Sequence, residues 1–299
     1  MSRGLPRSAN DVIEQLLDER MQKVEEAFNA DGLGFTGPLY AGVDDLLRLS
    51  VEDLVRRPER RSRLVILLTT SGGYIEVVQR MVAILRYHYE YVIFVIPNYA
   101  FSAGTVLAMS GDEIHMDYYS RLGPIDPQVE SASGKMVPAL GYLVQWERLL
   151  QKARKGELTM VEAQLMIDGF DQAELYQYGQ ARDLSIALLS EWLVNYKFKN
   201  WTRTESLGKA VTMATRKRRA KAIAKKLNET ERWHSHGHGI SMAVLRRDLN
   251  LRIDDLDQKP EVCDKVKQYH SLLDDYMAKM TQGGVLHTIG SYVPYARRS

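Results

Sequence analysis

The sequence predicts an α/β fold with a mostly parallel sheet, extended at both ends by largely helical segments. Two continuous apolar runs at 63–70 and 91–97, RLVILLTT and YVIFVIP, are each followed by a turn and an amphipathic helix. Strands that are buried on both faces of a parallel sheet read as such unbroken runs, and they alternate with helices. With 299 residues, 45% hydrophobic and 26% charged, the chain can build its own core.

The first half of the chain divides into elements by its apolar spacing. Residues 10–30 have helical spacing and Asn10 in a capping position, and 31–42, with four glycines, predicts an irregular connection. We expect further helices at 43–56, 75–87 and 102–110. The three expected strands are 63–70, 91–97 and a short one at 113–117, followed by a Gly/Pro loop at 119–128.

From about residue 141 the sequence reads as largely helical. The expected helices are 170–196, 205–227, 239–251 with Asn250 as a C-cap, and 260–280 opened by Pro260. We therefore divide the chain into an N-terminal helical arm (1–56), an α/β core (57–140), and a mostly helical part (141–299) that completes the core and packs subunits together.

The charge of the chain is unevenly distributed. Residues 195–226 hold eleven Lys/Arg and one acid, Glu205, whereas the whole chain carries only +2, so the remainder carries −8. No groove-reading or aromatic-interleaved motif accompanies this basic segment, which argues against nucleic acid. We expect the segment to form a solvated helix face that meets acidic surface of the same chain or of a neighbouring subunit.

Membrane and secretory classes are disfavoured. No apolar run approaches the roughly 20 residues that span a bilayer, and the N-terminal stretch lacks the apolar core of a secretion signal. Cys263 is the only cysteine, so no intrachain disulfide can form, which suits a reducing compartment. We expect a cytoplasmic protein.

Two turns at neighbouring strand ends carry the residues most suggestive of chemistry. Ser102, in FSAGT, begins a helix, where unpaired backbone N–H groups are available, and the small residues after it leave room for a substrate. Gly72 and Gly73, in TSGGY, can aim N–H groups into the same cleft, as can Ala103. The alternative is that both are ordinary strand-to-helix turns and that Ser102 is an N-cap.

The segments TTSGGY, FSAGTVLAMSGDEIHMD and GPIDPQ together resemble the serine dehydrogenase proteinase family of the Clp-protease/crotonase superfamily. The resemblance is close over about 63–140 and implies a Clp/crotonase-like fold built of ββα repeats. It also implies that Ser102 is a nucleophile, that Gly72, Gly73 and Ala103 form an oxyanion hole, and that Asp126 and His236 complete a triad in the order Ser, Asp, His.

The general base is open between two residues. His236 follows the family order, and Lys135 would suit the Ser–Lys pair of related peptidases if burial lowered its pKa. The chain has Pro127 and Gln128 where Clp proteases carry their histidine. A zinc site is suggested by the alternating histidines His234, His236 and His238, but the glycines among them favour a loop over a rigid set of ligands. We expect no metal or organic cofactor.

The resemblance therefore predicts a serine peptidase that hydrolyses peptides or proteins through an acyl-enzyme and assembles as a homo-oligomer. The sequence contains no phosphate-binding loop, so any ATP-driven unfolding would need a separate partner. Two other function classes stay open: a scaffold that kept the fold and lost catalysis, and an acyl-CoA enzyme of crotonase type.

Overall fold

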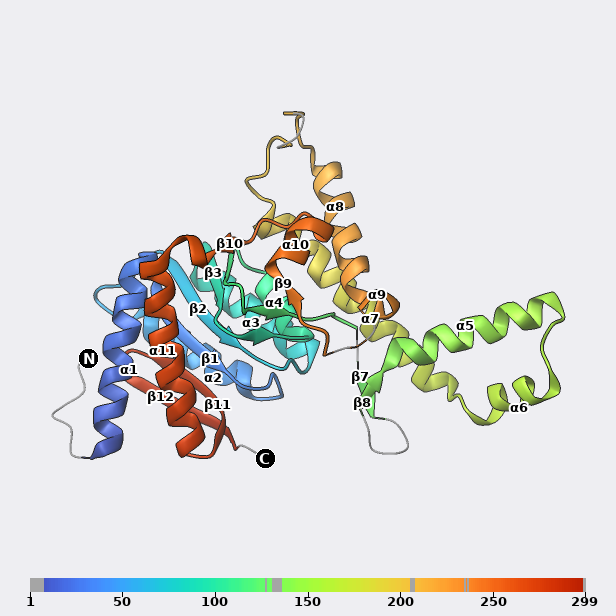
Figure 1. Ribbon diagram of the computed structural model, residues 1–299, viewed down its shortest axis with the longest axis horizontal. Helices are drawn as coiled ribbons and strands as arrows, with labels where there is room; N and C mark the ends of the chain where they lie inside the picture. Colours follow the sequence, from blue (N-terminus) through green and yellow to red (C-terminus); the bar gives the residue numbers. More distant parts are fainter. Residues whose placement is uncertain are drawn as a thin grey trace.

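In the computed structural model, which describes residues 8–126, 128–130, 136–204, 208–233, 235 and 237–297, a seven-stranded sheet forms the centre of the molecule (Figure 1). In spatial order its strands are β10 (Asp254–Asp255), β5 (Glu113–Met116), β3 (Tyr91–Ile96), β2 (Arg63–Thr69), β1 (Asp31–Thr36), β11 (Gln282–Thr288) and β12 (Ser291–Arg297). The strands from β10 to β1 pair in parallel, and β11 is antiparallel to β1 and β12. This confirms the predicted α/β class and its mostly parallel sheet.

Helices cover both faces of the sheet. One face packs against α1 (Ala9–Phe28) and α11 (Pro260–Lys279), through a core that includes Met21, Tyr269 and Val65. The other face packs against α2 (Val43–Val55), α3 (Ile75–His88) and α4 (Ala103–Met109), through alternate strand residues such as Ile66 and Phe94. Because successive strand residues point to opposite faces, the unbroken apolar runs of β2 and β3 supply both cores.

The expectation of an irregular connection at 31–42 is wrong, because its first half forms the central strand β1. Its glycines are required by close packing: a Cβ on Gly32 would lie 2.5 Å from the sulfur of Met21, and one on Gly34 would lie 2.1 Å from the hydroxyl of Tyr269. Glycine in a strand marks this kind of approach. The helices α1 and α11 can therefore lie directly on β1.

The C-terminal part also differs from the sequence prediction in places. The expectation of a mostly helical part at 141–299 named no strand there and so misses the hairpin β11–β12, which adds two strands to the sheet. The expected helix at 205–227 begins only at Met213, where Thr212 is the N-cap, and is α8 (Met213–Asn228). At the N-terminus Ser8, not Asn10, caps α1 through a capping box with Asp11. Asn250 is a left-handed C-cap, as predicted.

Between the core and α8 the chain makes a projecting arm. A short antiparallel hairpin, β7 (Gln128–Glu130) with β8 (Met136–Pro138), leads into α5 (Ala139–Lys155) and α6 (Met160–Asp168). These two helices extend away from the sheet, and α7 (Gln172–Trp192) leads back towards it (Figure 1). The chain continues as a π-helical turn (Leu193–Lys197), and the end of α7 packs on the core through Leu188, Leu189 and Trp192.

A small second sheet joins three distant segments beside the main one. Its strands are β4 (Tyr99–Ala100), β6 (Arg121–Leu122) and β9 (Ile240–Ser241). Short helices α9 (Thr230–Trp233) and α10 (Met242–Leu249) flank β9, and a 3-10 turn (Leu256–Gln258) precedes α11. Over the part of the chain that the structure describes, no helix has the length and apolar character needed to cross a membrane.

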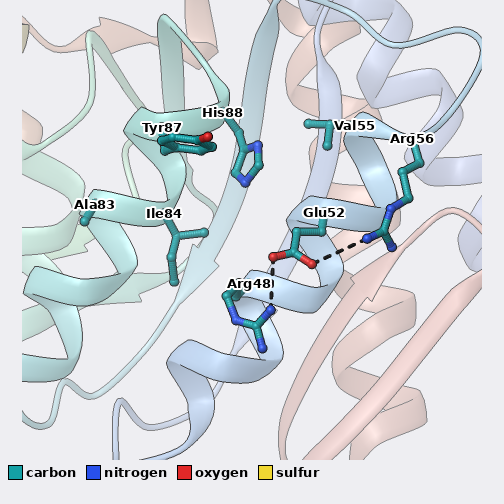
Figure 2. A pocket seen from close by; sticks show the side chains of 8 residues that line it. All are labelled: Arg48, Glu52, Val55, Arg56, Ala83, Ile84, Tyr87 and His88. Atoms are coloured by element: carbon teal, nitrogen blue, oxygen red, sulfur yellow. Dashed lines mark hydrogen bonds and ion pairs between the residues drawn. The ribbon is translucent and has the colours of Figure 1, made fainter.

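A shallow groove lies between α2 and α3. Arg48, Glu52 and Arg56 line it from α2, with Glu52 paired to both arginines, and Ile84 and Tyr87 line it from α3 (Figure 2). The helix α3 has 14 residues and is therefore about 20 Å long, and this groove lies towards its C-terminal end. The turns that sequence analysis singled out lie at the other end of α3.

Candidate active site

The turn that follows β2 is held between two other segments at the carboxyl ends of the strands. On one side, Thr70 N–H donates to the carbonyl of Tyr99 at 3.0 Å, and Phe101 N–H donates to the carbonyl of Thr70 at 2.9 Å. On the other side, Tyr74 N–H donates to the carbonyl of Leu39 at 2.7 Å. These bonds hold the S-G-G turn beside the segment that leads into Ser102. In open α/β sheets this edge is where ligands bind.

Ser102 occupies a strained turn between β4 and α4. Its φ of 52° and ψ of −123° lie outside the regions that L-residues commonly populate, and its side chain makes no capping hydrogen bond to α4. The residue is half-buried. Strained backbone of this kind persists where the surroundings hold it and is concentrated at functional sites. No described residue hydrogen-bonds the Ser102 hydroxyl, and a sharp strand-to-helix turn that presents a serine in this way resembles a nucleophile elbow.

Gly72 lies directly against Ser102. A Cβ on Gly72 would lie 2.8 Å from the Cβ of Ser102 and 3.3 Å from the backbone nitrogen of Ala103. The φ of Gly72 is 102° and that of Gly73 is 151°, so both positions use backbone conformations that favour glycine. The structure therefore brings the two predicted glycines, Ser102 and Ala103 together at one place.

The backbone N–H groups of Gly72, Gly73 and Ala103 differ in whether they form a hydrogen bond. The N–H of Gly72 donates to the hydroxyl of Thr70 at 3.0 Å. Within the described ranges, no hydrogen bond uses the N–H of Gly73 or of Ala103. Gly73 is exposed, and Ala103 adjoins the Ser102 side chain. Ala103 thus supplies an open donor next to Ser102, Gly73 supplies a second open donor in the adjoining turn, and Gly72 supplies the close approach between the two turns.

Two threonines that the sequence reading did not single out hold this geometry. The fully buried Thr105 hydroxyl lies 2.8 Å from the carbonyl of Ala100 and 2.9 Å from that of Gly123, and it accepts the N–H of Gly123 at 2.9 Å. It therefore ties the Ser102 turn to the G-P-I-D loop. Thr70 fixes the S-G-G turn through Gly72, as described above. The only sequence signal for both residues is a hydroxyl side chain next to a glycine turn.

Asp126 ends the loop that Thr105 anchors. The residue is fully buried, and the loop is tied to α8 because Ile125 N–H donates to the carbonyl of Leu227 at 3.0 Å. The small sheet shows how the surrounding segments are arranged: Leu122 of β6 pairs with Ala100 on one side and with Ile240 on the other. In the sequence, β9 begins four residues after His236, and β6 ends four residues before Asp126.

Both candidate bases lie outside the described residues. His234 and His236 are outside the described residues on either side of Ser235, and Lys135 falls in the gap 131–135. His238 is described: its side chain is exposed, and its ring lies 5.9 Å from that of Trp233.

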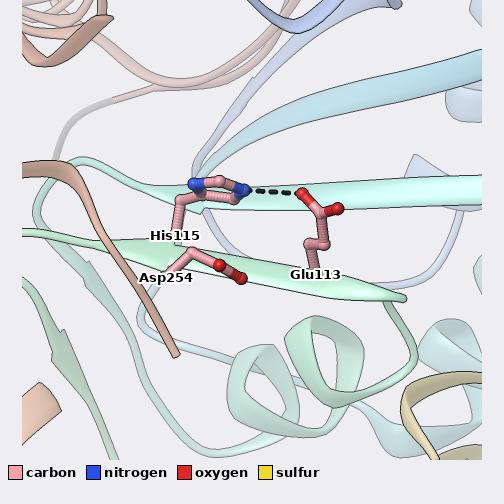
Figure 3. Close-up of side chains that lie close together, drawn as sticks. All are labelled: Glu113, His115 and Asp254. Carbon is pink, nitrogen blue, oxygen red and sulfur yellow. Dashed lines mark hydrogen bonds and ion pairs between the residues drawn. The ribbon is translucent and has the colours of Figure 1, made fainter. Parts of the chain in front are cut away.

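A second cluster of titratable groups lies on β5 and β10, among Glu113, His115 and Asp254 (Figure 3). The Nε2 of the buried His115 is 2.8 Å from a carboxylate oxygen of Glu113, and Tyr91 donates to Glu113 at 2.6 Å. The His115 hydrogen bond, followed by that of Tyr91, lowers the pKa of Glu113 to about 2. Arg63 also lies 3.6 Å from Glu113, so these acids are already balanced by donors and cations. We interpret the cluster as a structural link between strands.

A family model described as ClpP-like SDH-type serine proteinase matches residues 10–160 of the chain. Two uncharacterised proteins of Methanocaldococcus jannaschii are similar in sequence. One is 28% identical over 141 residues, which cover 46% of this chain and 42% of the relative, and the other is 31% identical over 75 residues, which cover 25% and 26%. The matched part thus spans less than half the length of these relatives.

Among solved structures, two mutants of the 1510-N membrane-bound stomatin-specific protease are similar at 12% and 13% identity, both with a TM-score of 0.45. The first comparison covers 77% of this chain and 81% of that protein, and the second, a complex with a substrate peptide, covers 89% and 86%. The ClpP protease catalytic domain of Plasmodium falciparum is similar at 15% identity and a TM-score of 0.30, over 38% of this chain and 60% of that domain.

Proposed function

We propose that this chain, which belongs to the ClpP-like SDH-type serine proteinase family, hydrolyses peptide bonds through an acyl-enzyme on Ser102. The observation that carries the proposal is the strained turn at Ser102, whose hydroxyl does not cap its helix and which adjoins the open N–H groups of Gly73 and Ala103. Nucleophile and oxyanion donors must meet at one reacting carbonyl, and the contact of Gly72 with Ser102 and Ala103 supports this, because it brings the two turns together.

The reaction would begin when the Ser102 oxygen attacks the carbonyl carbon of the substrate and gives its proton to a general base. The carbonyl oxygen becomes negatively charged and accepts hydrogen bonds from the N–H groups of Gly73 and Ala103. The base then protonates the leaving amine, the peptide bond breaks, and Ser102 holds the acyl group as an ester. Water, deprotonated by the same base, releases the acid and restores the serine.

We propose His236 as that base, with Asp126 to orient it and to stabilise its charge, and keep Lys135 as the alternative. The pairing of β9 with β6 supports the histidine, because Ile240, four residues after His236 in the sequence, pairs with Leu122, four residues before Asp126. The burial of Asp126 also supports the role, since a carboxylate shielded from water interacts more strongly with an imidazolium.

A fluorophosphonate probe tests the proposal, because it reacts with activated serines and leaves ordinary ones unmodified. We expect mass spectrometry of the labelled, purified protein to place the adduct on Ser102 and to find none after Ser102→Ala. Ser62→Ala, which removes an exposed serine at the opposite end of β2, is the matched control and should label normally.

The same assay identifies the base. Labelling that is lost in His236→Ala but kept in Lys135→Ala would support the histidine, and the reverse would support the lysine. Absence of labelling in a folded wild-type protein would contradict the peptidase proposal and favour a scaffold that has lost catalysis.

We further propose that the substrate is a peptide or an unfolded protein segment and that the chain works as a homo-oligomer. An extended substrate suits the exposed edge formed by Ser71, Gly73 and Tyr74. Folded protein substrates would then require a separate unfolding partner.

A further inference from the structure

The tip of the projecting arm, residues 156–181, exposes an apolar surface. It contains α6 and the first half of α7, and α6 has no buried residue. Met160 is 90% exposed, Val161 70%, Leu165 57% and Ile167 75%. A nine-residue helix is only marginally stable alone in water, and an apolar surface of this kind marks an interaction site.

The same arm tip carries acids and no cations, although Glu162 pairs with Lys152 of the adjoining helix α5. Residues 156–181 contain no lysine, arginine or histidine, and their five acids are Glu157, Glu162, Asp168, Asp171 and Glu174. An anionic lipid or nucleic-acid surface would repel such a segment. A surface that is basic and partly apolar would therefore complement the arm tip.

Helix α8 has a surface of that kind, which we call the basic face and which consists of Lys217, Arg218, Lys221 and Lys225. All four side chains are exposed, and three are spaced four residues apart along one side of the helix. Among the described residues none of the four forms an ion pair, although other cations of α8 bind their own chain. Arg219, for example, donates to the carbonyl of Leu249 at 2.6 Å. Met213, at the start of α8, is 54% exposed and adds apolar surface.

We propose that the arm tip of one copy of this chain binds the basic face of a second copy. The two surfaces complement each other in charge, and one contact covers both. Among the described residues of one chain no ion pair joins them. The contacts of α7 with the core lie at its C-terminal end, whereas the arm tip includes its N-terminal end, and a helix of 21 residues is about 30 Å long.

A contact between two different surfaces is heterologous, so each copy uses both and the assembly closes into a ring or grows as a filament. The inference rests on the proposed function only in taking the chain to form a homo-oligomer, and it does not depend on the chemistry of Ser102. It also gives the basic segment of the sequence a partner in the neighbouring subunit.

Reversing the charge of either surface tests the contact by sedimentation velocity in 50 mM and 500 mM salt. We expect the wild type to assemble in low salt and to dissociate at least tenfold more readily in high salt. The basic-face variant Lys217→Glu, Lys221→Glu, Lys225→Glu and the arm variant Glu157→Lys, Asp168→Lys, Glu174→Lys should each be monomeric. An equimolar mixture of the two variants should assemble again, because each arm then meets a face of opposite charge.

A control triple with the same change of charge, Lys23→Glu, Arg252→Glu, Lys259→Glu, alters exposed cations elsewhere and should assemble as the wild type does. A wild type that is monomeric in 50 mM salt, or a mixture that stays monomeric, would overturn the proposal. So would a monomer that binds a duplex oligonucleotide through the basic face. Fluorophosphonate labelling of the same samples separates this result from a failure of the peptidase proposal.

Discussion

At the scale of single residues, the backbone of Ser102 holds the most informative strain in the molecule. Its positive φ is of a kind that costs about 1–3 kcal/mol in a residue with a side chain. Glycine removes that cost but makes the unfolded chain more flexible, which lowers stability by about 0.4–1 kcal/mol. We expect Ser102→Gly to exceed Ser102→Ala in free energy of unfolding by about 1 kcal/mol, measured by urea denaturation.

The alanine variant is the matched control, because both variants lack the hydroxyl and only one keeps the strain. If the glycine variant were the less stable of the two, the turn would not be strained at this residue. A gain in stability with loss of labelling would show that the chain gives up stability to hold its nucleophile.

The sequence allowed the residues of this turn to be predicted, but not all of their roles. Ser102, Gly72, Gly73 and Ala103 lie in short motifs, so their proximity follows from two turns at neighbouring strand ends. Two of these roles depend on hydrogen bonds made by side chains in loops. Thr70 accepts the N–H of Gly72, and Thr105 links the Ser102 turn to Gly123. No periodicity in the sequence reports such bonds.

At the scale of elements, strands with apolar runs were predictable and strands with glycines were not. The runs of β2 and β3 indicate burial by themselves, whereas β1 begins DGLGFT and β11 begins QGG, compositions that are typical of loops. Glycine is favoured in β1 because helices pack closely on this strand. A Cβ on Gly34, for example, would collide with the hydroxyl of Tyr269. Strand pairing between residues 34 and 287 is likewise set by the whole fold.

Glu113 links three parallel strands and makes stability depend on pH. It lies on β5 and contacts Tyr91 at the start of β3 and Arg63 at the start of β2. Its pKa is lowered from 4.5 to about 2, so its stabilisation is fully present above about pH 4.5 and is lost as the pH falls towards 2. We expect Glu113→Gln to lower the free energy of unfolding by about 1–3 kcal/mol at pH 7.

The difference between Glu113→Gln and the wild type should shrink as the pH falls from 5 to 3, measured by denaturant titration at each pH. The control is Glu59→Gln, because Glu59 is exposed and forms no hydrogen bond or ion pair with the described residues. This variant should differ little from the wild type in free energy of unfolding at any pH. A difference for Glu113 that stayed constant with pH would mean that its charge does not hold the strands together.

At the scale of the whole molecule, the basic face of α8 and the apolar surface of α6 are both exposed in the single chain, and they lie on different parts of it. The basic segment was visible in the sequence, but its exposed face became definable only when α8 was seen to begin at Met213 and to use some cations internally. The apolar residues of α6, for which the sequence analysis made no prediction, are exposed in the structure. Both the basic face and this apolar surface are explained if the assembly, and not the single chain, is the unit that buries them.

The apolar side of the arm tip gives a final prediction that is independent of charge. Because Leu165 and Ile167 are exposed, we expect Leu165→Ser with Ile167→Ser to change the free energy of unfolding of the monomer by less than about 0.5 kcal/mol. The same double change should weaken assembly at least tenfold, since it removes the apolar part of the contact. Leu189→Ser, in the buried part of α7, is the control and should cost the monomer about 2–5 kcal/mol. Unfolding measured at submicromolar protein would decide, because a loss above 1 kcal/mol in the double variant would mean that the arm tip packs against its own chain.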